Sequence, residues 1–155
     1  MQMVVTGASG YVGGRLVPRL LEKGHTVTVI VRDTSRLDDV PWRDKVTIVQ
    51  GDLEDRRVVK EALTGQEVLY YLVHSMASSA QFDALEAKIA TTVAEEAKTA
   101  GLSRIVYLGG LHPDGKLSKH LASRKRVGEI LLASGVPTIA LQAGVIIGSG
   151  SASFE

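Results

Sequence analysis

The amino-acid sequence predicts an α/β domain built on a doubly wound parallel sheet, with about six strands in the order 3-2-1-4-5-6 and helices on both faces. Two observations lead to this prediction. Short β-branched apolar runs alternate with helix-length segments along the 155 residues, and a glycine-rich string joins the first run to the first helical segment. Runs that are apolar on both faces indicate strands buried between two layers of helices.

The expected strands and helices follow from the period of the apolar residues. Six short apolar runs are expected as strands, at residues 3–5, 26–31, 46–49, 68–73, 104–108 and 138–141. Apolar residues recur every three or four positions in three longer segments, which predicts helices at residues 11–23, 81–100 and 117–133. Gly101 and Gly135 follow the last two segments, as is typical of residues that end a helix.

Composition and charge narrow the function classes. The chain has 18 Lys and Arg against 17 Asp and Glu, a formal net charge of +1, 45% hydrophobic residues and no cysteine. Disulfides and cysteine metal sites are therefore excluded, and neither nucleic acid nor an anionic membrane is an expected partner, because both require clustered cations. No metal is expected, since spacings such as His-Glu-x-x-His do not occur. No apolar run reaches the roughly 18 residues of a membrane span, and we expect a cytoplasmic protein.

One domain is expected over residues 1–155, because the sequence contains no repeat, low-complexity stretch or linker. After the sixth apolar run comes a glycine-rich segment at residues 144–150, like a loop that leaves one domain to enter another. We therefore expect residues 1–155 to be the N-terminal part of a longer protein with a further C-terminal domain.

A glycine-rich string stands between the first expected strand and the first expected helix. It contains Gly7, Gly10 and Gly13, spaced three residues apart. Gly7 permits a tight turn, Gly10 lets the backbone approach a pyrophosphate, and Gly13 lets the helix pack closely on the strand. The N–H groups and the positive dipole at the start of the helix attract phosphate groups. The string therefore predicts a dinucleotide-binding loop.

The spacing Gly7-x-x-Gly10-x-x-Gly13 after Thr6 resembles the short-chain dehydrogenase/reductase superfamily, in particular its extended and atypical members. Further segments are similar to the NmrA-like atypical group of bacterial type, at residues 24–27, 31–33, 51–53, 71–76 and 145–150. The resemblance covers essentially the whole chain. It implies a Rossmann domain that binds NAD(P), from a protein with oxidoreductase or nucleotide-sugar-epimerase-like activity on an unidentified small molecule.

The same resemblance implies which residues hold the cofactor. The residues expected at the pyrophosphate form the loop and the start of its helix: Gly7, Ser9, Gly10, Tyr11, Val12 and Gly13. Asp52 and Leu53 are expected to flank the adenine, and Val73 and His74 to lie beside the ribose and the phosphates. Gly109, after the fifth strand, is expected at the rim of the cofactor.

Arg32 stands at the end of the second expected strand, where an acidic residue would bind the ribose 2′-hydroxyl of NAD. A cation at this place favours the 2′-phosphate of NADP, so NADP is the expected cofactor, with NAD as the alternative. Asp33 comes next and could still reach a hydroxyl, whereas Arg36 would add a second cation. The alternative for Arg32 is a solvated charge at a strand end.

Members of the superfamily that reduce or oxidise carbonyls use a serine after the fifth strand and a Tyr-x-x-x-Lys pair on the next helix. This sequence departs at all three places. The segment Leu108-Gly109-Gly110-Leu111 has glycine where the serine would be, His120 takes the place of the tyrosine, and Arg124 takes the place of the lysine. No Tyr-x-x-x-Lys occurs in the chain. His120 is a candidate acid, because imidazole groups titrate near neutral pH, and Arg124 one turn later would hold the ribose. The alternative is a solvated pair on an amphipathic helix.

Three functions remain open from the sequence. The first is an NADP-dependent oxidoreductase or epimerase-type enzyme whose substrate pocket lies in further residues. The second is an NADP-occupied sensor or regulator without turnover, as the resemblance implies for some NmrA-like proteins. The third is a structural subunit that keeps the dinucleotide as a stabilising ligand. Loss of the standard triad favours the last two, whereas the glycine loop fits all three.

Overall fold

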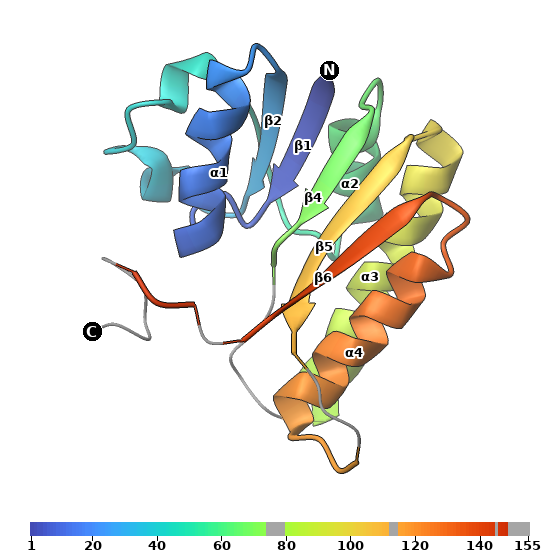
Figure 1. Ribbon diagram of the computed structural model, residues 1–155. Helices are drawn as coiled ribbons and strands as arrows, with labels where there is room; N and C mark the ends of the chain where they lie inside the picture. Colours follow the sequence, from blue (N-terminus) through green and yellow to red (C-terminus); the bar gives the residue numbers. More distant parts are fainter. Residues whose placement is uncertain (74–79, 112–114, 145, 149–155) are drawn as a thin grey trace.

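The computed structural model describes residues 1–73, 80–111, 115–144 and 146–148. One parallel sheet contains six strands in the order β3-β2-β1-β4-β5-β6 (Figure 1). These strands are β1 (Gln2–Thr6), β2 (Thr26–Val31), β3 (Thr47–Gln50), β4 (Val68–Tyr71), β5 (Arg104–Gly110) and β6 (Thr138–Ala143). The predicted α/β class, strand count and strand order are confirmed.

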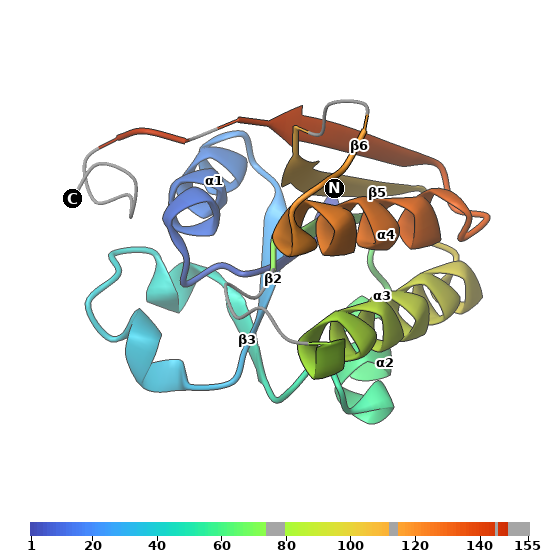
Figure 2. The same ribbon diagram turned by 90° about the horizontal axis from the view of Figure 1, so that it is seen from below.

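Helices cover both faces of the sheet, as predicted. On one side lie α1 (Tyr11–Glu22) and the short 3₁₀ helices η1 (Thr34–Leu37) and η2 (Arg43–Lys45), and on the other α2 (Arg56–Leu63), α3 (Ala80–Ala100) and α4 (Lys119–Leu132) (Figure 2). The three predicted helices correspond to α1, α3 and α4 within two residues at each end. Apolar periodicity does not predict α2, because its eight residues make only about two turns. Within the described ranges, every helix is too short or too polar to cross a bilayer.

Two apolar clusters form the core, one on each face of the sheet. Val5 and Val17 belong to the cluster between the sheet and α1. Ile105 and Leu131 belong to the cluster between the sheet and the layer of α2, α3 and α4, and Val4 joins them there. All five side chains are fully buried. Neighbouring residues of β1 thus point into different clusters, as expected for a strand covered on both faces.

Among the described residues, the α1 side of the sheet is partly uncovered at β6. The β5–β6 register pairs Val106 with Ile139 and Leu108 with Leu141. Val106 packs on the α1 side of the sheet, but α1 contacts β1 and β2 and does not extend over β6 (Figure 2). Ile139 and Leu141 are therefore 43% and 50% exposed. We call these four residues the open face.

Candidate functional site

Thr6 links the carboxyl ends of β1 and β4, the two neighbouring strands whose following connections run to opposite faces of the sheet. Doubly wound sheets bind ligands in the crevice at such a pair. The Thr6 Oγ1 donates to the carbonyl oxygen of Tyr70 and accepts from the N–H of Leu72, both at 3.2 Å. Thr6 is buried. Its side chain therefore fixes the floor of the crevice in addition to the main-chain ladder between β1 and β4.

The loop after β1 makes the tight turn predicted at Gly7. Gly7 has a φ of +77°, in the left-handed region that favours glycine. A Cβ at this position would lie 3.1 Å from the carbonyl carbon of Leu72. The N–H of Gly10 donates to the Gly7 carbonyl oxygen at 3.1 Å and closes the turn. The turn thus lies directly against the main chain at the end of β4.

At Gly13, helix α1 lies very close to the main chain of the loop. A Cβ at Gly13 would overlap the carbonyl oxygen of Gly7 and would lie 2.7 Å from the Cα of Ala8. Both Gly13 and Ala8 are buried. The helix therefore packs on the loop without space for a side chain at position 13, which is the role predicted for this glycine.

The start of α1 is suited to an anion. The first N–H groups of an α-helix have no carbonyl partner within the helix, and the helix dipole makes this end positive. Gly10 caps α1 without a side chain, and the first turn contains no acidic residue. Ser9 and Gly10 are exposed. The N–H groups, the dipole and the space above Gly10 together fit a dinucleotide pyrophosphate.

Tyr11 joins the first turn of α1 to the segment after β6. The Arg15 guanidinium carbon lies 3.8 Å from the centre of the Tyr11 ring, and Arg15 Nη1 donates to the Tyr11 carbonyl oxygen at 3.3 Å. A Cβ at Gly148 would overlap the Tyr11 hydroxyl. The spacing of the glycines in the loop does not indicate either Arg15 or Gly148.

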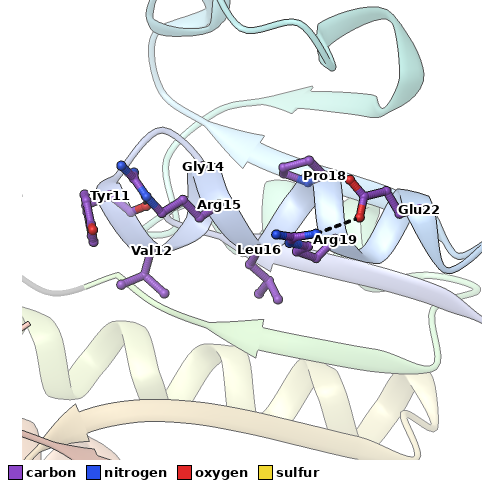
Figure 3. Close-up of a pocket in the computed structure, with 8 residues that line it drawn as sticks. All are labelled: Tyr11, Val12, Gly14, Arg15, Leu16, Pro18, Arg19 and Glu22. Atoms are coloured by element: carbon purple, nitrogen blue, oxygen red, sulfur yellow. Dashed lines mark hydrogen bonds and ion pairs between the residues drawn. The ribbon is translucent and has the colours of Figure 1, made fainter. Parts of the chain in front are cut away.

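A groove runs along the outer flank of α1 from this point (Figure 3). Val12 and Leu16 point toward the β4 side of α1, while Arg19 pairs with Glu22 at 3.1 Å farther along the helix. The lining residues are Tyr11, Val12, Gly14, Arg15, Leu16, Pro18, Arg19 and Glu22. The groove therefore begins at the same helix end as the candidate phosphate site.

At the end of β2, Arg32 and Asp33 differ in their surroundings. Both are exposed. One carboxylate oxygen of Asp33 accepts from the Ser35 hydroxyl at 2.6 Å and from the Ser35 N–H at 3.0 Å, which caps η1. These hydrogen bonds, with the nearby Arg36 charge, lower the pKa of Asp33. The Arg32 carbonyl oxygen accepts from the Gln50 side chain at 3.4 Å, and Arg32 directly follows the last residue of β2.

Asp52 and Leu53 lie in the turn after β3, beside the end of β2. The N–H of Gly51 donates to the Val31 carbonyl oxygen at 2.9 Å and joins the two strand ends. The Asp52 Oδ1 accepts from the N–H of Glu54 at 2.9 Å. Leu53 packs against the core cluster on the α2 side. These two predicted adenine contacts and Arg32 therefore occupy the same edge of the sheet.

The predicted contacts after β4 are described only in part. Val73 is half-buried and packs against the core cluster on the α2 side. His74 lies outside the described residues, as do Ser75 and Met76 of the same sequence segment. The predicted contact of His74 with the cofactor stays a prediction.

Gly109 is one of the two glycines at the end of β5, where the resemblance implies a serine in the superfamily. A Cβ at Gly109 would lie 2.9 Å from Cε1 of Tyr107 and 3.5 Å from the Tyr107 hydroxyl. The Tyr107 side chain therefore occupies the space that a serine side chain would need. The sequence alone does not reveal this conflict, because it arises only when residues two apart on β5 share one face.

His120 and Arg124 both lie on α4, as predicted. Ser118 caps this helix by accepting from the N–H of Leu121 at 3.3 Å, and His120 is half-buried in the first turn. A Cβ at Gly110 would lie 3.5 Å from Nη1 of Arg124. The Arg124 guanidinium therefore reaches the carboxyl end of β5.

A partly buried polar pair joins α3 to α4. The Ser123 hydroxyl donates to the Glu86 carboxylate at 2.6 Å. Glu86 also acts on the two buried tyrosines of β4 and β5, because burial raises the pKa of Tyr71 and Tyr107 and the Glu86 charge raises both further. The apolar period of α3 places Glu86 beside core positions, but a sequence pattern does not identify its partner on another helix.

Comparison with known proteins gives a family match. The model of a family described as NAD(P)H-binding matches residues 7–137. Sterol demethylase protein B of Methylococcus capsulatus is 32% identical over 131 residues, which cover 77% of this chain and 39% of that relative. The chain therefore spans well under half the length of this relative.

Two solved structures have the same fold. The NADPH-dependent quinone oxidoreductase of Escherichia coli, complexed with NADPH, is 25% identical with a TM-score of 0.75, over 90% of this chain and 48% of that one. The triphenylmethane reductase of Citrobacter sp. is 21% identical with a TM-score of 0.78, over 92% of this chain and 48% of that one.

These matches confirm the expected NAD(P) cofactor class and the resemblance to the atypical short-chain dehydrogenase/reductase superfamily. The observed loop fits such a cofactor. No side chain caps the start of α1, and Gly13 has no space for a Cβ. The match over residues 7–137 shows that this chain belongs to the NAD(P)H-binding family.

Proposed function

We propose that the chain binds NADP(H) in preference to NAD(H), with the loop from Gly7 to Gly13 on the pyrophosphate and Arg32 on the 2′-phosphate. The arrangement at the end of β2 carries this proposal. The Asp33 carboxylate, the group suited to the 2′-hydroxyl of NAD, already accepts two hydrogen bonds from Ser35, whereas the Arg32 side chain is exposed. A guanidinium forms strong charge-assisted hydrogen bonds to a phosphate.

The other predicted contacts belong to the same proposal. Asp52 and Leu53 flank the adenine, because they share the sheet edge with Arg32 and approach it through the Gly51 hydrogen bond to β2. Val73 and His74 lie at the ribose and phosphates. Ser9, Tyr11 and Val12 supply main-chain contacts at the pyrophosphate. Gly109 stands at the nicotinamide end.

Replacing Arg32 with alanine is expected to weaken NADPH binding by about ten- to a hundredfold and to leave NADH binding nearly unchanged. A hydrogen bond to a charged group contributes roughly 1.5–3 kcal/mol, and only NADPH carries the 2′-phosphate. Titration calorimetry with both cofactors on the wild-type and R32A proteins measures the two ratios.

Arg19→Ala is the matched control for that experiment. Arg19 is an exposed arginine near the opposite end of α1, where it pairs with Glu22 at 3.1 Å. Its removal changes the net charge by the same amount and is expected to leave both affinities unchanged. Equal losses for NADPH and NADH in R32A would show that Arg32 does not recognise the 2′-phosphate.

We propose that the full-length protein is an oxidoreductase, a role supported by similar proteins that include a ketoreductase and a quinone oxidoreductase, and by the cofactor class. A bound nicotinamide cofactor supplies or accepts a hydride. A non-catalytic NADP sensor or structural subunit is the second candidate, favoured by the Tyr107 ring that fills the serine position at Gly109. His120 and Arg124 test whether such an enzyme would take its acid from this chain, because general acid catalysis needs a positioned proton donor.

His120→Ala is expected to leave slow NADPH oxidation by the full-length protein unchanged, because this domain holds the cofactor without the serine and Tyr-x-x-x-Lys groups. Absorbance at the NADPH band with a panel of carbonyl compounds measures the rate. A loss of about 10²–10⁴ in H120A, together with a wild-type rate that falls as pH rises through neutrality, would instead assign His120 as the general acid.

We propose that residues 1–155 form one N-terminal domain and that a further domain supplies the substrate contacts. This chain covers only 39% of the sterol demethylase protein, which supports the proposal. The open face supports it as well, because Ile139 and Leu141 are exposed there. Exposed apolar patches often mark interfaces. We also propose that the protein is cytoplasmic.

A further inference from the structure

Tyr107 is enclosed between β5 and α4 by two glycines. Its Cε1 would lie 2.9 Å from a Cβ at Gly109 and 3.1 Å from a Cβ at Gly128. The Tyr107 side chain is 3% exposed. The ring also packs edge-on against Tyr71 of β4, with the ring centres 5.9 Å apart. The strand and the helix therefore approach each other around this ring, and either glycine would displace it if replaced by a larger residue.

The Tyr107 hydroxyl fixes α4 at one particular residue. It donates to the carbonyl oxygen of Arg124 at 2.9 Å. Burial raises the pKa of Tyr107 to about 12, against the opposing effect of the Arg124 charge, so the hydroxyl stays a donor at neutral pH. A hydrogen bond from a strand side chain to the second turn of the helix sets both the rotation and the translation of that turn relative to β5.

This bond has a consequence for the Arg124 side chain. The guanidinium lies beside Gly110, with Nη1 3.5 Å and Cδ 3.6 Å from the place of a Cβ there. Gly110 is the last residue of β5, one strand from the crevice between β1 and β4. A dinucleotide held by the loop after β1 extends its nicotinamide half toward this side of the crevice.

We propose that Tyr107 is a positioning residue, which holds the α4 main chain so that the Arg124 guanidinium donates to the nicotinamide-ribose half of the bound dinucleotide. The proposal rests on the proposed cofactor function. It gives the Tyr107 hydroxyl a role on the α4 side of β5, where the ring meets Gly109 and Gly128.

The test compares two ligands on three variants. NADPH contains the nicotinamide ribose, whereas adenosine 2′,5′-bisphosphate contains the adenosine half and the 2′-phosphate only. Arg124→Ala is expected to weaken NADPH binding about tenfold or more, and Tyr107→Phe about three- to tenfold, since one hydrogen bond is removed in each. Both variants should bind adenosine 2′,5′-bisphosphate as the wild type does. Tyr71→Phe, which removes a hydroxyl from the adjacent buried ring, should change neither affinity.

The double variant separates positioning from a general structural role. If Tyr107 acts through Arg124, then Y107F/R124A binds NADPH no more weakly than R124A alone. Additive losses, or equal losses for both ligands in Y107F, would overturn the proposal. Unchanged NADPH affinity in R124A would overturn it as well, while cofactor binding would stand. A wild-type protein that binds neither ligand would instead contradict the proposed function itself.

Gly128→Ala is a second way to disturb the position of the Tyr107 ring. The added methyl group would lie 3.1 Å from the Tyr107 ring and would press on it without touching Arg124 or the hydroxyl. We expect the same selective loss of NADPH binding as in Y107F. Loss of adenosine 2′,5′-bisphosphate binding in a folded G128A protein, checked by near-ultraviolet circular dichroism, would contradict the positioning role.

Discussion

Replacing Gly13 with alanine is expected to lower the free energy of unfolding by about 3 kcal/mol or more, at or above the upper end of the usual cost of overpacking. The added Cβ would overlap the Gly7 carbonyl oxygen and approach the Ala8 Cα to 2.7 Å. Both obstacles are main-chain atoms, so a change of side-chain rotamer cannot relieve them. The loop or the whole first turn of α1 must move. Urea denaturation followed by circular dichroism measures the loss.

Gly14→Ala is the control for the same chemical change one residue later. A Cβ at Gly14 would lie 3.6 Å from the Ala8 carbonyl oxygen, an ordinary contact. Alanine within a helix is more favourable than glycine by roughly 0.5–1 kcal/mol, so G14A should be slightly more stable than the wild type. A lower free energy of unfolding for G13A and a higher one for G14A would support the close packing at position 13. Similar small effects for both would contradict it.

Gly10→Val is expected to abolish measurable NADPH binding, at least a hundredfold loss, while the domain stays folded. Gly10 is exposed, and a Cβ there would lie 3.3 Å from the Gly7 carbonyl oxygen, which a small shift can relieve. The branched methyl groups would project over the N-terminus of α1, where we propose that the pyrophosphate binds. Valine is a poor helix cap, so a stability loss of about 1 kcal/mol is expected as well.

Gly144→Val makes the same substitution at a glycine where a Cβ would meet nothing within 4 Å. It should retain both the stability and the NADPH affinity of the wild type. Calorimetry measures affinity, and thermal unfolding confirms that each variant is folded. A folded G10V protein with wild-type affinity would show that the loop after β1 is not the cofactor site.

The parts of this fold that the sequence predicts are those encoded locally. The α/β class follows from alternating apolar runs and helices, and the turn at Gly7 and the close packing at Gly13 follow from three glycines in seven residues.

Contacts between distant segments were beyond prediction. Tyr107 and Arg124 are 17 residues apart, and Glu86 and Ser123 are 37 apart. Which side chain meets which helix depends on how α3 and α4 lie on the sheet, and periodicity carries no information on that. The short helix α2 was missed for a different reason, since its eight residues give too few periods.

The link between β1 and β4 also sets when the site can form during synthesis. Met3 pairs with Val68, so 68 − 3 = 65 residues separate the two partners. At about 5–20 residues per second, roughly 3 to 13 s pass between translation of the two strands. During that interval β1 can pair only with β2, and Thr6 has neither Tyr70 nor Leu72 to bond. In a nascent chain, Thr6 can therefore join β1 to β4 only after β4 has been translated.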